Sequence, residues 1–389
     1  MTPRIPASGP LARLLRPMAQ RAWARAGTHG DRAFLVVASS YWNEPKISQH
    51  EVARTLARRG PTIFLEPAWI GNRRNWGASF ADDGPTVISP PAIPRGIRVG
   101  AVAKLNLMLG FAMWRALVEA APANRRLVTW VLEFRFASII EGDGYRPRFV
   151  FHNVDIQKDG KPEARMAGHS TLCACSSSAA AELLRPSNPR TISIGHGVSR
   201  ENAQLGAVAA HDRQASPGPK RTVGFVGHWS PHVHIDMELV RRMLAAHPEL
   251  ILEVTTPAES IADLAGEFPG RVRALGFLPW SEILRRTLEW DAAVVPYDGK
   301  KPKIFYSCPY KIPPLLSAAL PVICVDIPAI RGLAPHLHLS TSADEFIALT
   351  GRAIRGELRV NPDDASAFRK ARVWDNILDQ VVVAHDDLA

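Results

Sequence analysis

The sequence predicts an α/β fold with two halves, each built on a parallel sheet. From residue 33 onward, apolar runs of strand length alternate with segments of helix length, which is the pattern that parallel sheets produce. The alternation stops once, at 201–221, where the sequence is polar and rich in Ala, Gly and Pro, and then it resumes. The length of 389 residues also favours two domains over one core. We therefore expect two parallel-sheet α/β domains that face a central cleft.

The first half contains short runs rich in Val, Ile, Leu and Phe, separated by helix-length pieces. The segment 47–60 is expected to be a helix, because Val52 and Leu56 recur at helical spacing and Gly60 ends the pattern. The strands of this half are expected at 33–40, 62–67, 127–133, 148–155, 171–177 and 191–197.

The second half has the same alternation, followed by a terminal helix. Its strands are expected at 222–228, 250–256, 272–277, 290–298 and 321–326. The chain therefore divides into a basic segment 1–30, a first domain 31–200, a linker 201–221, a second domain 222–363 and a C-terminal helix 364–389.

The composition favours anionic partners and excludes several enzyme classes. The formal charge of +10 and the pI of about 9.8 suit nucleic acid, phosphate-bearing ligands or an anionic membrane. Nucleic acid is disfavoured, because the charge does not come with interleaved aromatic residues. The four cysteines form no CxxC pair and predict a reduced compartment. There is no GxSxG, Walker A or HExxH motif.

The N-terminal segment 1–30 carries arginines and has no acid before Asp31. It lacks the apolar stretch of a signal peptide. It is either a basic interfacial helix that lies on anionic lipid or a disordered basic tail. The residues that can share one helical face are Leu11, Leu14, Leu15, Met18 and Trp23.

The most apolar long segment is 99–121, which Lys104, Asn106 and Arg115 interrupt. No run reaches the roughly 20 apolar residues of a membrane span. The segment is therefore either a buried helix or a helix half sunk in a bilayer surface.

The stretch 306–325 holds the strongest candidate for an anion site. Pro313 and Pro314 suit the first turn of a helix, where a missing N–H leaves no partner unsatisfied. The helix would begin near the carboxyl ends of the strands, with Lys311 just before it. The residues predict either a phosphate site or a plain helix start with a solvated lysine.

Three further loops follow predicted strands. Gly227 and His228 end one strand, where a glycine lets a ligand approach the backbone, but no GxGxxG pattern supports a nicotinamide cofactor. Asp155 can serve as a general base or simply cap a loop. His196 and Gly197 precede the linker and should line the cleft. The histidines that would suggest zinc do not have the spacing of a structural site; they are His228, His232 and His234.

The second half resembles the donor-binding half of the GT-B glycosyltransferases, which have two Rossmann-like domains. The similar segments are FVGHWSP, LILEVTTP, VRALGFLPWSEI, AAVVPYD and PYKIPPLLSAALPVICVDIP, within about 222–330. In many relatives the last motif reads P-x-K-x-x-E-x-x-x-x-G-x-P. Pro309, Lys311 and Pro321 match it, whereas Pro314 stands at the acid position and Ala319 at the glycine position.

A closer resemblance is to the glucuronosyltransferase family of bacterial xanthan assembly, and it touches both halves. It rests on SSYWNEPKISQHEVARTLARRG, FHNVDIQ, IGHGVSRENAQLG and VVPYD followed by PYK. This resemblance implies an inverting, metal-independent transferase with no cofactor besides its UDP-sugar substrate. The donor would bind the second domain. The acceptor, a glycan or a polyprenyl-diphosphate-linked precursor, would bind the first domain.

The resemblance also implies a cytoplasmic, peripheral location at the inner face of the cell membrane, reached through the basic N-terminal half. It implies a role for Asp155 as the catalytic base. It also implies that Tyr297 and Lys311 contact the donor. Together with the strand-end residues, the expected donor-binding set is Gly227, His228, Tyr297, Tyr310 and Lys311, and the expected acceptor or cleft set is Glu44, His50, His196 and Gly197.

The departures at Pro314 and Ala319 keep a second function open. A polar donor contact of the resembled family falls on Pro314, so the donor sugar, glucuronic acid in that family, is not determined. The alternative is a non-catalytic protein that binds nucleotide sugars or glycans with a degenerate GT-B fold.

Overall fold

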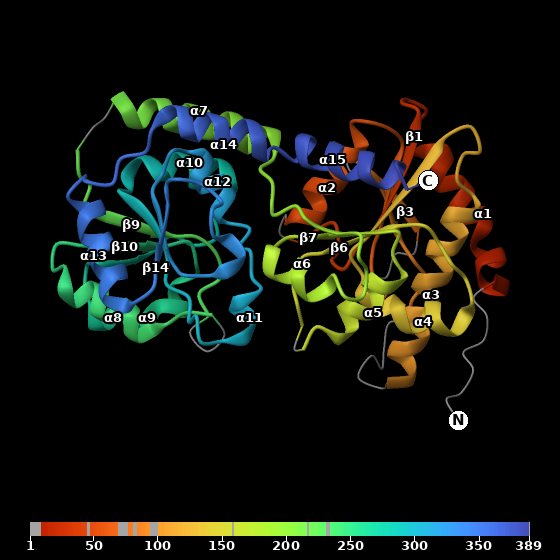
Figure 1. Ribbon diagram of the computed structural model, residues 1–389, viewed down its shortest axis with the longest axis horizontal. Coiled ribbons are helices and arrows are strands. Elements are labelled where there is room, and N and C mark those ends of the chain that lie inside the picture. Colours follow the sequence, from red (N-terminus) through yellow and green to blue (C-terminus); the bar gives the residue numbers. More distant parts are fainter. Residues whose placement is uncertain are drawn as a thin grey trace. The chain divides into compact units, whose positions relative to one another are not determined.

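A computed structural model divides the chain into two compact units (Figure 1). It describes residues 9–44, 47–68, 77–80, 84–93, 100–157, 159–215, 218–230 and 234–388. The first unit consists of Met1–Ser176, Ala180–Ile194 and Leu378–Ala389. The second consists of Ser177–Ala179 and Gly195–Ile377.

The first unit is built on an eight-stranded sheet in the order β3-β4-β2-β1-β5-β6-β7-β8. Its strands pair in parallel, except that β3 runs antiparallel to β4 at the edge. The central strands have side chains buried on both faces, which explains why they appear as continuous apolar runs. The bounds are β1 Arg32–Val37, β2 Thr62–Leu65, β3 Gly77–Phe80, β4 Thr86–Ser89, β5 Arg126–Val131, β6 Val150–Asn153, β7 Leu172–Cys175 and β8 Thr191–Ser193.

Helices and one 3-10 turn accompany this sheet. They are α1 Gly9–Arg25, α2 Ser48–Ala57, α3 Gly100–Glu119, η1 Phe134–Phe136, α4 Ala137–Asp143, α5 Lys161–His169 and α6 Ser178–Leu184. Helix α1 packs along α3, and the indole Nε1 of Trp23 donates a hydrogen bond to the carbonyl of Leu117 at 2.9 Å. A disordered tail is therefore the wrong reading for residues 9–25, and residues 1–8 lie outside the described part.

Helix α3 is apolar along its length but is buried mainly in its second half. Phe111, Trp114 and Leu117 are fully buried, whereas Leu105 near its start is 40% exposed. Among the described residues, α3 is long and apolar enough to span a bilayer, yet 44% of its most apolar window is already buried in protein. A core helix meets the same criteria, so the burial of the second half favours packing over insertion.

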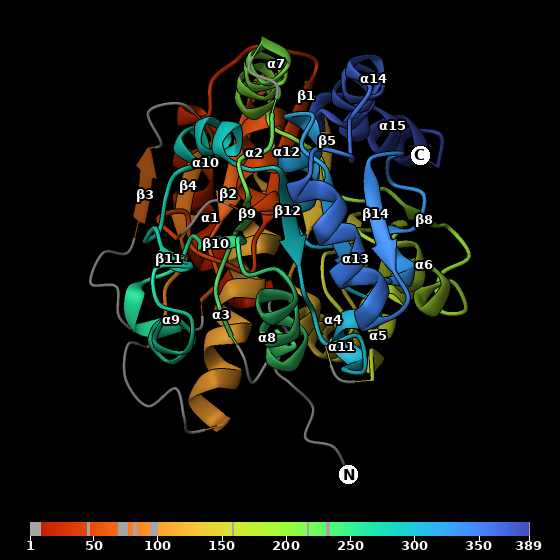
Figure 2. The same cartoon turned by 90° about the vertical axis from the view of Figure 1, so that its left-hand side faces the viewer.

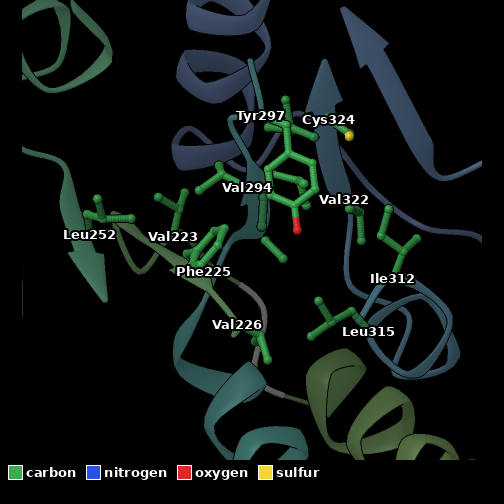
Figure 3. Close-up of a cluster of buried hydrophobic side chains, with 14 of the residues drawn as sticks. Val223, Phe225, Val226, Leu252, Val294, Tyr297, Ile312, Leu315, Val322 and Cys324 are labelled. Carbon is green, nitrogen blue, oxygen red and sulfur yellow. The ribbon is translucent and has the colours of Figure 1, made fainter. Parts of the chain in front are cut away.

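The second unit is built on a parallel six-stranded sheet in the order β11-β10-β9-β12-β13-β14. Val223 and Phe225 of β9, Val294 of β12 and Leu315 all contribute to one apolar core (Figure 3). The bounds are β9 Thr222–Phe225, β10 Ile251–Val254, β11 Val272–Ala274, β12 Ala292–Val295, β13 Val322–Val325 and β14 Leu337–Ser340.

The helices and 3-10 turns of this unit fall into packed groups. Helix α7 packs on α10, α12 and α14, while α8 packs on α13 (Figures 1 and 2). They are α7 Arg200–Ala215, α8 Met237–Ala246, η2 Ala258–Ile261, α9 Ala262–Glu267, α10 Trp280–Arg286, η3 Thr287–Glu289, α11 Pro302–Phe305, α12 Ile312–Ser317, η4 Pro328–Ile330, α13 Ala343–Ile354 and α14 Pro362–Arg372. The last helix, α15 Trp374–Asp386, begins in this unit and continues into the first, which includes Leu378–Ala389.

Two predicted segments differ from the structure. The linker predicted at 201–221 is wrong over most of its length, because α7 occupies Arg200–Ala215. Its buried face consists of small side chains such as Gly206 and Ala209, so it carries no apolar stripe that would identify a helix. The single C-terminal helix is in fact α14 and α15, separated at Val373, whose backbone is extended (φ −63°, ψ 139°).

Candidate functional site

Lys311 is positioned by the turn that leads into α12, where Pro313 and Pro314 occupy the second and third helical positions. The predicted helix start at the double proline is confirmed. The helix spans only Ile312–Ser317, too short to build a strong dipole, so the positive charge at this point comes from the Lys311 ammonium itself.

The Lys311 ammonium lies among aromatic groups. Its Nζ donates a hydrogen bond to the Tyr297 hydroxyl at 3.0 Å and lies 4.1 Å from the ring centroid of Phe225. The Tyr297 ring centroid is 5.1 Å from the same atom, so two π faces partly stabilise the cation. Tyr297 points into this cluster from the end of β12 (Figure 3).

Gly227, in the loop after β9, lies directly beside the Lys311 ammonium. Its φ of +116° lies in a region that residues other than glycine rarely adopt. A Cβ atom there would lie 3.0 Å from Lys311 Nζ. The glycine therefore serves both the conformation of the loop and the space in front of the cation.

Lys311 is half-buried, and the burial around its ammonium lowers its pKa from 10.5 to about 7. Among the described residues, no carboxylate forms an ion pair with it. A buried ammonium without a counter-ion is unfavourable unless an anion completes the site. This arrangement is typical of a site prepared for an anionic ligand.

Further basic side chains lie near His234, whose ring centroid is 5.8 Å from that of Tyr297. Burial lowers the pKa of the His234 imidazole, and the positive charges of Lys303, Lys311 and Lys301 lower it further, together with His228. Because each of these groups acts on His234, they lie close to one another. Their summed field favours a ligand with more than one negative charge.

A cavity of about 510 Å³ opens beside these residues. Its wall includes Trp229 after β9, Glu259 after β10, and Asp298 and Lys301 after β12. The rest of its wall belongs mainly to α8, η2 and α9, and neither Lys311 nor Tyr297 lines it, so the cavity adjoins the Lys311 cluster only through Asp298 and Lys301. Its volume is within the range of small-molecule sites.

His196 lies in the second unit and contacts Tyr310. Their ring centroids are 5.6 Å apart, and the ring of His196 also faces Trp374 at 6.4 Å. Burial lowers the pKa of His196 to about 4, and the nearby Arg372 guanidinium contributes to this, so the ring is neutral at pH 7. A Cβ on Gly197 would approach Trp374 to 2.6 Å, so this glycine serves packing.

Asp155 follows β6 in the first unit and is half-buried. Its backbone carbonyl accepts a hydrogen bond from Asn153 Nδ2 at 2.8 Å, and Ser176 Oγ donates to the carbonyl of Val154 at 2.8 Å. Glu163 Oε1 accepts from the Gln157 N–H at 2.9 Å. Three side chains thus hold the loop that carries Asp155, which suits a residue that must be positioned.

Glu44 and His50 stabilise the loop after β1. Glu44 Oε2 accepts from the Tyr41 N–H at 3.1 Å. His50 is fully buried; its Nδ1 accepts from the Ile47 N–H at 3.2 Å and its Nε2 donates to the Tyr41 carbonyl at 2.9 Å. Both ring nitrogens of His50 are therefore used within the protein, and a contact with an acceptor stays a prediction.

The structure thus gathers Gly227, Tyr297 and Lys311 in one place, with the exposed His228 nearby. Tyr310 lies instead with His196. Sequence analysis missed Phe225, because a phenylalanine in an apolar strand looks like any core residue.

Glu163 was missed for a different reason, since an acid in a helical first turn reads as a cap. As for metals, no described cluster of three or more His, Cys, Asp or Glu residues suits an ion. His232 lies outside the described residues.

Comparison with known proteins gives likeness in structure but not in sequence. No protein-family model matches the chain, and no curated protein matches it either. Sucrose-phosphate synthase from Thermosynechococcus elongatus superposes with a TM-score of 0.68 at 13% identity, over 92% of this chain and 99% of that chain. The lipopolysaccharide outer core galactosyltransferase WaaB gives 0.64 at 14%, over 92% and 99%. Anabaena HepE, solved with UDP and glucose, gives 0.63 at 14%, over 91% and 99%.

These proteins are glycosyltransferases of the GT-B fold, and the likeness extends over nearly the whole of both chains. The predicted fold is therefore confirmed: the chain has two parallel-sheet α/β domains in the GT-B arrangement of elements.

Proposed function

We propose that this protein is an inverting glycosyltransferase that takes a sugar from a UDP-sugar and passes it to a glycan or lipid-linked precursor. The observation that carries the proposal is the Lys311 ammonium, which has no described carboxylate partner and lies with other basic groups at the carboxyl ends of β9 and β12. The GT-B fold supports it, and HepE, a protein of similar structure, has been solved with UDP-glucose.

The basic groups would act mainly on the leaving group. As the bond from the sugar to the diphosphate breaks, negative charge grows on the diphosphate oxygen. Lys311 and Lys301 would stabilise that charge more than the ground state, which lowers the barrier. In the proposed reaction, Asp155 takes the proton from the attacking hydroxyl of the acceptor.

The acceptor class is proposed from the surface of the first unit. Leu14 of α1 is 77% exposed beside Arg13 and Arg16, and Leu105 near the start of α3 is 40% exposed. Apolar side chains flanked by arginines suit the interface of an anionic membrane. We propose that this surface keeps the enzyme at the inner face of the cell membrane, next to a polyprenyl-diphosphate-linked acceptor.

Glucuronic acid is the proposed donor sugar, because the basic groups near Lys311 exceed what a diphosphate alone requires. Lys303 is exposed and close enough to His234 to depress its pKa, so it could meet a carboxylate on the sugar. A neutral hexose donor would leave this lysine without a ligand contact.

The test is a panel of UDP-sugars incubated with the full-length protein and a polyprenyl-diphosphate-linked acceptor, with release of UDP as the readout. We expect turnover, with UDP-glucuronic acid above UDP-glucose. The Asp155→Asn variant should lose transfer by at least 100-fold and retain UDP binding within about twofold. Binding of UDP-sugars with no release by the wild type would favour the alternative, a non-catalytic binding protein, which the replaced residues Pro314 and Ala319 keep open.

A further inference from the structure

The surroundings of the Lys311 ammonium consist of rings, a hydroxyl and a thiol. Phe225 of β9 and Tyr297 after β12 face the ammonium directly. Cys324 of β13 lies near enough for the two groups to perturb each other. The His234 ring lies 5.8 Å from that of Tyr297, and the basic groups that act on it include His228, Lys301 and Lys303.

The nearest acids on these elements are already neutralised. Asp326, which follows β13, accepts a hydrogen bond from Arg331 Nε at 2.8 Å. Asp298, which follows Tyr297, lies 3.9 Å from the Lys301 ammonium and accepts the Lys300 N–H at 3.1 Å. Burial raises the pKa of the Cys324 thiol, so it stays protonated and supplies no negative charge. The π faces and the Tyr297 hydroxyl favour the ammonium only partly, and no described carboxylate is placed to compensate its charge.

The empty site thus favours the neutral amine near and above pH 7. Burial lowers the pKa of Lys311 to about 7. A diphosphate reverses this balance, because an anion within about 4 Å strongly favours the charged form of an amine. Gly227 places backbone without a side chain directly beside Nζ, where a Cβ would lie 3.0 Å from it.

We propose that the diphosphate of the donor binds together with one proton, which Lys311 takes up as it closes on the anion. The inference rests on the proposed function, and it makes donor binding at the same site depend on pH. In this step the neutral amine takes a proton from water, and the resulting ammonium pairs with the diphosphate. The proton stays during sugar transfer, because the departing UDP carries more negative charge than the donor. It returns to solvent when UDP leaves.

The experiment is isothermal titration calorimetry of the full-length protein at pH 8, in buffers whose heats of ionisation differ. The ligands are UDP-glucose, which has no ionisable group near this pH, and UDP, whose terminal phosphate (pKa about 6) is already ionised. The dependence of the binding heat on the buffer counts the protons that are taken up. We expect between about half a proton and one proton per site at pH 8, and almost none for UDP-glucose at pH 5.5, where the lysine is already charged.

Two variants keep the test specific. Tyr297→Phe removes the hydroxyl that accepts from Nζ, so the proton should still be taken up, with its midpoint moved to lower pH. Lys311→Met should abolish the uptake and weaken UDP binding at least tenfold. Lys370→Met, at an exposed lysine of α14 outside the proposed site, should leave the proton count unchanged.

The outcomes separate the two proposals. Binding of UDP to the wild type with no proton uptake at pH 8 overturns the inference and leaves the glycosyltransferase proposal standing. Uptake that persists in Lys311→Met also overturns it, because another group would then carry the proton. If neither UDP nor UDP-glucose binds at all, the proposed function fails, and the inference fails with it.

Discussion

Replacement of Lys311 by methionine should make the protein more stable while it loses its donor site. Methionine has a similar length and no charge, so it can fill the space beside Phe225 and Tyr297 with apolar contacts. Replacement of a buried charge by a packed apolar side chain is often stabilising. The functional loss and the gain in stability would then have the same physical cause.

The magnitude follows from the pKa of the lysine. A drop from 10.5 to about 7, at about 1.36 kcal/mol for each pKa unit, means that the folded state disfavours the ammonium by about 5 kcal/mol. This is an upper bound, because Lys311 is half-buried and water screens part of the cost. Between about pH 7 and pH 10.5 the unfolded chain binds more protons than the folded one, so wild-type stability rises with pH. The cost is fully present below about pH 7.

The assay is urea denaturation of wild type and Lys311→Met at pH 6.5 and pH 9. The variant should be more stable at both, and its advantage should shrink by up to about 3 kcal/mol at pH 9, where the wild-type lysine is neutral. Lys303→Met is the matched control and should show no such dependence, because its side chain is exposed. An advantage that is equal at the two pH values, or a less stable variant, would refute the assigned charge state.

Three further substitutions test other parts of the structure. Gly227→Ala should destabilise the fold by about 1–3 kcal/mol, because φ is +116° and the new Cβ meets Lys311. It should also abolish the thermal shift that UDP produces. Gly266→Ala, at an open helical position, is the control and should be neutral or stabilising. Arg221→Gly should raise the free energy of unfolding by about 0.5–1 kcal/mol in urea titrations, because this exposed arginine has a φ of +58°; a loss of stability would show that its side chain matters more than its backbone. Trp23→Ala should cost about 3–5 kcal/mol in the same assay and free α1 for proteolysis, whereas the exposed Leu14→Ala should do neither; resistance of both variants to protease would contradict the packing of α1 on α3.

The strands of both sheets could be located from the sequence because of how parallel sheets are buried. A strand covered on both faces needs apolar side chains at every position, so β1, β9 and β12 stand out as continuous runs. The strands that were missed are short or lie toward a sheet edge, as β3 and β14 do, and their sequences GASF and LHLS carry little of this signal. Helix α7 was missed because it packs through Gly206 and alanines, and a Cβ on Gly206 would lie 2.4 Å from Ser317 Oγ.

The sequence by itself determined the α/β class, the start of α12 at its two prolines and the presence of a lysine beside it, since these depend on local patterning and on the covalent structure of proline. Only the tertiary structure decided what that lysine touches. Strand β9 pairs with β12, and β12 pairs with β13, so Phe225, Tyr297 and Cys324 converge on Lys311 from positions far apart in the chain. Strand order is set by long-range packing rather than by local sequence. For this reason only the folded chain shows that, among its described residues, no carboxylate lies beside the ammonium. The chemistry of the site depends on that absence.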